Sequence, residues 1–356
     1  LQDALGHGRD DLPWWEILVV RNAGSGSSAC VLRLHHVIGD GLALVNAFGK
    51  ILTNEDGSPK EPSLSKGGQK RERKNILSTI WSLICATFHV LTLSTTKYDD
   101  DTIFSRMNRS SMQHSGRREV VLFPTVPLDF VKNLKAAAGV TVNDVLVFAV
   151  SQAIHDYCKA QDDPVLASKR GSSLSCRALL PVAFPRSPES ISDLAGALRN
   201  LWCMVSCDIG VGFEDVVERL EYVRSRTQEL KAKPRAYMQL KVQNGLGPHI
   251  PVSVGQQTVF DTFSRHSLVL TNVPGPSKIQ IFAGRPVKSA QLFFDNLITQ
   301  VDFLSYAGQV SGNIVLDAEE LPGADSFGRL YAGAMVALAD RFDVDVPAEV
   351  KRAAQV

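Results

Sequence analysis

The stretch from Val31 to Gly41 is the strongest constraint on the fold, because it joins two adjacent histidines to Asp40 and Gly41. Apolar and polar residues alternate ahead of the histidines, which predicts a β-strand. Apolar residues recur at helical spacing after Gly41 and predict an amphipathic helix. These are Leu42, Val45, Phe48 and Leu52. We therefore expect a strand-to-helix turn that presents an imidazole at the end of a sheet.

A carboxylate four residues beyond the second histidine can fold back toward it. Asp40 then either accepts a hydrogen bond from one ring nitrogen of His36 or anchors the turn through an arginine, and both roles orient the ring. Gly39 and Gly41 are expected to supply backbone freedom for a close approach. A histidine at a strand end is, on composition alone, more often structural or solvated than catalytic.

The flanking sequence predicts the remaining elements of the first part of the chain. Residues 12–20 read as a strand entered through a proline, and the Gly/Ser-rich residues 23–27 turn the chain back into the motif strand. A β-hairpin is therefore expected before the histidines.

Bulk composition excludes some functions. The chain has 356 residues, 44% hydrophobic and 21% charged, with a net charge of +1, so it offers no electrostatic argument for nucleic acid and we expect no nucleic-acid partner. Its six cysteines form no CxxC pair, which is typical of free buried thiols in a reducing compartment. Cys203 and Cys207 have no matching second pair of ligands, so no metal site is predicted.

Residues 54–116 read as a connecting region. Polar and turn-forming residues run from 54 to 74 and end in a basic cluster at 70–74, after which residues 76–93 contain no Asp, Glu, Lys or Arg. Three interpretations remain open for 76–93: a helix lying on lipid, a helix spanning a bilayer, or a buried helix. The adjacent basic cluster favours an interfacial helix on an anionic membrane surface.

Two further stretches carry candidate site residues. Thr141 precedes a long apolar helix as its expected N-cap, and Asn143 and Asp144 follow in its first turn, where capping alone is one interpretation of both residues. The stretch 267–276 is a strand that ends in Pro-Gly-Pro, and by itself it predicts only a strand end. Residues 287–296 and 297–304 read as further strands of the same sheet.

Four separated strings resemble the motifs of one enzyme family, in the same order. HHVIGDG resembles the HHxxxDG motif of acyl-CoA-dependent acyltransferases, which peptide-synthetase condensation domains share. TVNDVL, TNVPGP and the pair SYAG and Asp317 resemble further motifs of the wax ester synthase/diacylglycerol acyltransferase family. The chain departs from that family at Arg199-Asn200, where Gly-Asn is usual, which leaves the local backbone geometry open.

The resemblance implies an α/β fold of two chloramphenicol-acetyltransferase-like lobes with the active site in a tunnel between them. We expect residues 1–53 to be the C-terminal part of the first lobe, 54–116 a linker with the apolar helix 76–93, and 117–356 the second lobe. Only 35 residues precede His36, fewer than the family normally has, so the first lobe is expected to be truncated at its N-terminus.

The resemblance also implies an activity, the O-acylation of a fatty alcohol or diacylglycerol with a long-chain acyl group from acyl-CoA. His36 is then the general base, His35 mainly positional, and Asp40 a support for the local architecture. Asn143 is the candidate donor to the substrate carbonyl oxygen. The other motif residues are expected near substrate: Gly41, Asp144, Asn272, Pro274 and Gly275. No cofactor is expected, since acyl-CoA is a co-substrate.

The implied partners are acyl-CoA, the lipid acceptor and a membrane or lipid-droplet surface. We expect membrane association on the cytosolic face, at the endoplasmic reticulum or plasma membrane depending on the source. Two alternatives remain: a catalytically idle lipid-binding scaffold of the same fold, and a condensation-type domain of a peptide synthetase. Acyl transfer from a labelled acyl-CoA separates an enzyme from an idle scaffold.

Overall fold

The computed structural model describes residues 13–24, 26–54, 56–58, 76–105, 112, 115, 117–184 and 198–355. The chain divides into two compact units, one formed by residues 1–67 with 183–202 and the other by residues 68–182 with 203–356. Residues 183–202 are thus grouped with the first unit, whereas the sequence analysis assigned them to the second lobe. The predicted α/β class is confirmed.

The first unit contains the predicted hairpin and motif helix. Strand β1 (Trp15–Gly24) pairs antiparallel with β2 (Ser27–Leu34). A single 3-10 turn, η1 (His36–Ile38), follows, and helix α1 (Gly41–Ile51) begins after it. The strand-to-helix turn predicted at the histidines is therefore confirmed.

The second unit is built on a six-stranded mixed sheet with the order β3-β10-β9-β6-β4-β5. In that order the strands are Arg118–Pro127, Gln309–Asp317, Gln300–Tyr306, Leu268–Pro274, Arg177–Ala183 and Trp202–Asp208. Strand β10 is antiparallel to β3 and β9, while β6 is parallel to both β9 and β4. Parallel neighbours need long connections: the chain between β4 and β6 carries helices, whereas the chain between β6 and β9 carries two short strands.

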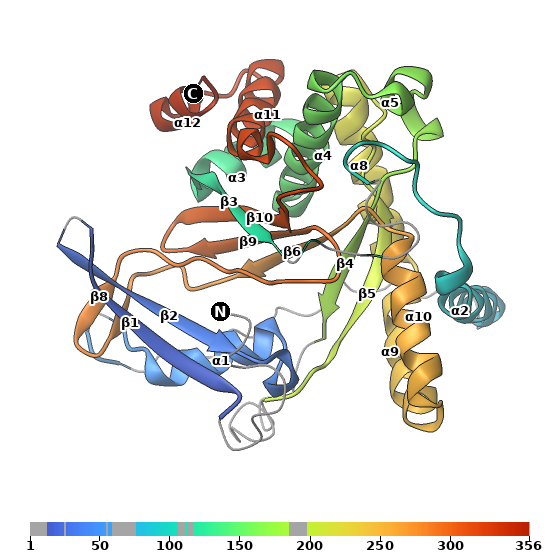
Figure 1. Ribbon diagram of the computed structural model, residues 1–356, viewed down its shortest axis with the longest axis horizontal. Helices are drawn as coiled ribbons and strands as arrows, with labels where there is room; N and C mark the ends of the chain where they lie inside the picture. The colour runs from blue at the N-terminus through green and yellow to red at the C-terminus, as the bar shows by residue number, and fades with distance from the viewer. Residues whose placement is uncertain are drawn as a thin grey trace. The chain divides into compact units, whose positions relative to one another are not determined.

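Helices cover one face of this sheet, as Figure 1 shows for α3, α4, α11 and α12. Their bounds, with that of α8, are Leu128–Ala138, Val142–Ala160, Phe327–Arg341, Ala348–Ala353 and Val216–Ala232. Tyr331 of α11 stacks on Phe123 of β3 with the ring centroids 4.7 Å apart, and Phe303 of β9 lies beside both. Every residue of α4 from Asp144 to His155 is buried, which accounts for its uninterrupted apolar run from Val145 to Val150.

Three further helices of the second unit lie outside this layer: α2 (Ile76–Leu91), α9 (Arg235–Leu246) and α10 (Val252–Ser264). Among the described residues, no single helix is both long enough and apolar enough to cross a membrane. The pair α3 and α4 reaches the required length and composition together, but it is bent by 95°.

The short elements complete the second unit. They are α5 (Pro164–Ser168), the 3-10 turns η2 (Leu93–Thr95), η4 (Gly171–Ser173), η5 (Gly247–His249) and η6 (Ala324–Ser326), and strands β7 (Gln280–Phe282) and β8 (Arg285–Val287).

The prediction of a strand at 287–296 is wrong. β8 ends at Val287 and pairs with β7 in a separate two-stranded sheet, and β9 begins only at Gln300. The intervening loop is held by side chains of the large sheet: the Phe294 amide donates to Asp302 (2.9 Å) and Asn313 Nδ2 donates to the Leu292 carbonyl (2.6 Å). These contacts satisfy backbone groups that a strand would have paired.

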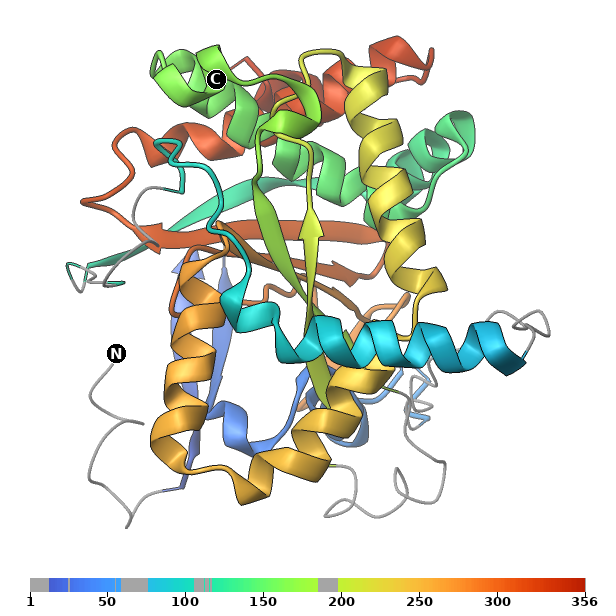
Figure 2. The ribbon, with the colours of Figure 1, turned by 90° about the vertical axis from the view of Figure 1, so that its right-hand side faces the viewer.

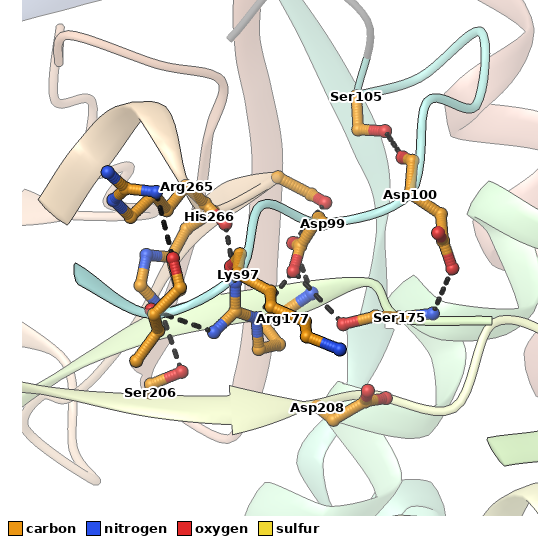
Figure 3. Close-up of polar contacts among 12 residues, drawn as sticks. Lys97, Asp99, Asp100, Ser105, Ser175, Arg177, Ser206, Asp208, Arg265 and His266 are labelled. Carbon is orange, nitrogen blue, oxygen red and sulfur yellow. Dashed lines mark hydrogen bonds and ion pairs between the residues drawn. The ribbon is translucent and has the colours of Figure 1, made fainter. Parts of the chain in front are cut away.

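A buried ionic network ties the segment after α2 to the sheet (Figure 3). Arg177 Nε of β4 lies 2.5 Å from Asp99 Oδ1, and the guanidinium also donates to the carbonyls of Lys97 and Arg265. Asp99 additionally accepts from Ser267 Oγ at 2.6 Å. Several charge-assisted bonds therefore converge on one carboxylate, as a buried charge requires.

His266 belongs to the same region but is not suited to base catalysis. Its Nε2 lies 2.8 Å from Ser206 Oγ and its Nδ1 lies 2.6 Å from the Thr262 carbonyl (Figure 3). Burial lowers the pKa of His266 to about 3, so its ring is neutral at ordinary pH and too weak a base to activate the Ser206 hydroxyl. We interpret this pair as structural.

Candidate active site

His35 holds the start of the motif turn. Its amide donates to the Trp14 carbonyl (2.8 Å), its Nδ1 accepts from the Val37 amide (3.2 Å), and its ring lies 5.1 Å from the Trp14 ring. The side chain therefore caps η1 and is already engaged with the protein. These contacts support the positional role predicted for His35.

Asp40 links the motif to a distant part of the chain. It is the N-cap of α1, and its Oδ1 accepts from the Ala43 amide at 3.0 Å. Its Oδ2 accepts from the Leu201 amide at 2.8 Å, although the two residues are separated by 161 positions. Because Asp40 is buried and bound by two amides, it is well placed to fix the backbone around His36, in line with its predicted architectural role.

Gly39 is needed for space, not for backbone freedom. Its φ of 170° is extended backbone that any residue adopts, contrary to the reason given by the sequence analysis. A Cβ at this position would lie 2.9 Å from Ala43 Cβ, closer than real Cβ atoms approach. Gly41, predicted near substrate, is the first residue of α1.

His36 lies at the start of η1 with its ring half-buried against Trp202, edge to face with the centroids 5.7 Å apart. Asn200 Nδ2 donates to the His36 carbonyl at 2.9 Å, and Trp202 Nε1 donates to Asn200 Oδ1 at 3.2 Å. Burial lowers the pKa of His36 and outweighs the nearby charge of Asp40, which raises it. A neutral imidazole at neutral pH can accept a proton, which is the requirement for a general base.

Sequence reasoning missed the segment that supports this turn. Arg199-Asn200 was noted only as a departure from a motif, yet the Arg199 carbonyl accepts from the Asp40 amide (3.4 Å) and Asn200 binds the carbonyl of His36. The only available signal was an asparagine directly before an apolar strand. These contacts also explain why residues 183–202 belong to the first unit.

The second unit places TVNDVL at the start of α4. Thr141 and Asp144 form a reciprocal capping box, with the Thr141 amide 2.9 Å from Asp144 Oδ2 and the Asp144 amide 3.2 Å from Thr141 Oγ1. Asp144 Oδ1 also accepts from Thr227 of α8 at 2.6 Å. These contacts support the capping interpretation of Asp144. Asn143 is half-buried in the same first turn, and its role toward substrate stays a prediction.

The TNVPGP string forms the end of β6 and the turn after it. Asn272 is half-buried in the strand, and Pro274 is its exposed last residue. The Gly275 amide donates to the Ser305 carbonyl of β9 at 2.9 Å, and a Cβ on Gly275 would lie 2.4 Å from that oxygen. Glycine is therefore required here by the backbone of β9. Substrate contact by Asn272, Pro274 and Gly275 stays a prediction.

The candidate residues thus fall into three local groups. His35, His36, Asp40 and Gly41 belong to the turn of the first unit, Asn143 and Asp144 to the start of α4, and Asn272 to Gly275 to the end of β6. Of these three groups, only the first contains a titratable base with a lowered pKa, His36, and its turn is contacted by Asn200 and by the Leu201 amide.

Two family models match two separate parts of the chain. The wax ester synthase/diacylglycerol acyltransferase catalytic domain matches residues 9–146, and the WS/DGAT C-terminal domain matches residues 199–338. The chain belongs to the wax ester synthase/diacylglycerol acyltransferase family. This confirms the resemblance carried by the four strings, and it places the chain in a family of O-acyltransferases.

Individual members of the WS/DGAT family are distant in sequence. Wax ester synthase/diacylglycerol acyltransferase 2 of Arabidopsis thaliana is 24% identical over 87% of this chain and 69% of its own length. The O-acyltransferase WSD of Acinetobacter baylyi is 23% identical over 87% of this chain and 70% of its own length. The solved structure of a wax ester synthase/diacylglycerol acyltransferase from Marinobacter aquaeolei VT8 has a TM-score of 0.59 at 18% identity, covering 93% of this chain and 73% of the other, and shows the shared fold.

Proposed function

We propose that the chain is an acyl-CoA-dependent O-acyltransferase that transfers a long-chain acyl group to a fatty alcohol, to diacylglycerol, or to both. The observation that carries the proposal is His36, a half-buried imidazole with a lowered pKa inside the family's HHxxxDG motif. Asp40 and Asn200 hold the backbone on either side of it.

The proposed reaction needs one base and no covalent acyl-enzyme. His36 removes the proton of the acceptor hydroxyl, and the oxygen attacks the thioester carbonyl carbon. The C–S bond then breaks, and the coenzyme A thiolate takes the proton back from the imidazolium. A positioned base of this kind typically contributes about 10²–10⁴-fold in rate.

Charge develops on the carbonyl oxygen in the tetrahedral intermediate. We propose that the Asn143 amide donates to this oxygen. One such donor is typically worth about 10²–10³ in kcat. The half-buried place of Asn143 in the first turn of α4, within the family's ND motif, supports the assignment.

The proposed acceptors and products are lipids, so we also propose that the protein works at a membrane or lipid-droplet surface on the cytosolic side. No cofactor enters the scheme, because acyl-CoA supplies the activated acyl group. Which membrane is involved, endoplasmic reticulum or plasma membrane, depends on the source of the chain.

Incubation of the full chain with a labelled long-chain acyl-CoA tests the activity. Hexadecanol and diacylglycerol are offered together in detergent, and we expect labelled wax ester, triacylglycerol or both, with release of free coenzyme A. Label found only in free fatty acid, or in neither product, contradicts the proposal and supports the idle lipid-binding alternative. A parallel incubation adds an amine acceptor, and label transferred to the amine but to neither alcohol supports the condensation-type alternative.

The pH profile of this reaction is expected to report the burial of His36. A base works in its deprotonated form, so kcat/KM should fall as the pH drops through the His36 pKa. Burial lowers that pKa, which puts the acidic limb below pH 6.5. Trp202→Ala exposes the ring and should move the limb to higher pH, whereas Trp15→Ala on β1 is the matched control and should leave it in place. A limb that is unmoved in Trp202→Ala contradicts the assignment of the titration to His36.

A further inference from the structure

Helix α2 presents an apolar face to solvent. Ile80, Trp81, Ile84, Phe88 and Leu91 are between 49% and 68% exposed, and their spacing puts them along one side of the helix. The opposite side is also apolar, since Ala86 is buried and Leu83 is half-buried where α2 packs against α9. A helix at an aqueous surface normally carries polar residues on its outer side, so burial within this unit does not account for the outer apolar row.

The neighbouring helices extend this exposed apolar character. Figure 2 shows α2 passing over one end of α9, with η2 beside α10, in agreement with the packing of α2 on α9 and of α10 on η2. Tyr237 and Leu246 of α9 are each about half exposed, and Val252 and Val254 of α10 are exposed too. Together the outer sides of α2, α9 and α10 form what we call the three-helix surface.

Cations outnumber acidic residues in the segments that form this surface. Residues 231–264 contain Lys231, Lys233, Arg235 and Lys241 and one acidic residue, Asp261 on α10, and residues 76–96 contain no Asp, Glu, Lys or Arg. Lys233 and Arg235 contact Glu229 just outside the stretch, whereas Lys241 lies 5.5 Å from the centre of the Tyr237 ring. Apolar side chains, aromatic rings and cations are the combination that an anionic lipid interface binds.

We propose that the three-helix surface docks on an anionic phospholipid surface, with α2 lying in the interfacial plane. Helix α2 has 16 residues and is therefore about 24 Å long, which is shorter than the roughly 30 Å hydrocarbon core. It fits an interfacial position with its outer row in the acyl chains. A second copy of the same surface is a poorer occupant, because the four cations of residues 231–264 outnumber their one carboxylate, Asp261, and two copies would bring an excess of like charge together. The proposal rests on the proposed function, because it names the lipid surface at which the enzyme works. The contacts that support it do not involve His36 or the other candidate catalytic residues.

Vesicle sedimentation of the full chain tests the apolar contribution. Vesicles of phosphatidylcholine with phosphatidylserine are used at low ionic strength, without any acyl-CoA or acceptor. The double variant Trp81→Ser/Phe88→Ser should lower the apparent affinity about 100-fold, or about tenfold for each side chain removed from the interface. Leu122→Ser on β3 removes an apolar side chain of similar exposure from the same unit and should bind as the wild type does.

The charge contribution is tested separately. Lys231→Glu/Lys241→Glu should lose most binding to the anionic vesicles. Added salt should likewise weaken the binding of the wild type to them. Lys351→Glu on α12 is the matched control and should have no such effect. Vesicles of phosphatidylcholine alone should bind the wild type more weakly than the anionic vesicles.

A conservative variant guards against misfolding of the serine variants. Vesicles with brominated acyl chains should quench part of the tryptophan fluorescence of the wild type. Trp81→Phe should bind these vesicles as tightly as the wild type does. The quenched component of the fluorescence should be missing from this variant. Equal quenching in Trp81→Phe, wild-type affinity in the double serine variant, or no vesicle binding by the wild type overturns the proposal. A dimer in buffer that Trp81→Ser/Phe88→Ser converts to a monomer also overturns it, in favour of a second copy as the occupant. Acyl transfer is measured in detergent, so failure of the activity and failure of the docking surface are distinguishable.

Discussion

Replacing His36 with alanine is expected to lower kcat/KM for acyl transfer by about 10²–10⁴-fold, because the acceptor hydroxyl loses its base. The ring is half-buried against Trp202 and has a lowered pKa, so it is available as a neutral acceptor. The contacts that position residue 36 involve its backbone carbonyl, which the variant keeps. The loss is measured with labelled acyl-CoA under conditions in which KM and kcat are separated, and it should fall mainly on kcat.

His35→Ala is the matched control, since it removes a neighbouring imidazole. The His35 ring accepts from the Val37 amide and packs on Trp14, so its removal should destabilise η1 locally. It should reduce the rate of acyl transfer far less than His36→Ala does. Urea unfolding of both variants checks that the fold persists. If His36→Ala turns over at the wild-type rate, or if both variants lose activity equally, the general-base role of His36 is wrong.

Replacing Arg177 with methionine is expected to produce the largest loss of stability, about 3–5 kcal/mol in the free energy of unfolding. The substitution leaves the carboxylate of Asp99 buried without its cation, which lies 2.5 Å away in the wild type. It also removes donors to the carbonyls of Lys97 and Arg265, which connect the segment after α2 to the sheet. Urea-induced unfolding followed by circular dichroism measures the change.

Two variants separate the buried charge from a general effect of losing an arginine. Arg117 forms an ion pair with Glu319 in which both side chains are largely exposed, so Arg117→Met should unfold close to the wild-type urea midpoint. Asp99→Asn/Arg177→Met removes the unpaired charge and should be more stable than Arg177→Met alone. An unfolding midpoint for Arg177→Met that matches Arg117→Met would show that the network contributes little.

Features encoded over a few neighbouring residues were predicted well. The strand, the turn and the helix around His36 follow from alternation, glycine placement and helical spacing, and the structure confirms all three. The capping of α4 by Thr141 and Asp144 was read from residue types at fixed offsets. The strand predicted at 287–296 was wrong because its apolar residues lie in a loop. Asp302 and Asn313, on strands later in the chain, bind the backbone of this loop.

Local patterns were therefore sufficient for the secondary structure of the motif, while the α/β class followed from the family resemblance and the base role of His36 stays a prediction. They could not reveal that Asn200 and Leu201 hold the backbone of His36 and Asp40, because those partners lie more than 160 residues apart and leave no periodic trace. Nor could they show that the apolar row on α2 faces outward. A run of apolar residues reads the same whether it is buried or exposed, and only packing against α9 distinguishes its two sides.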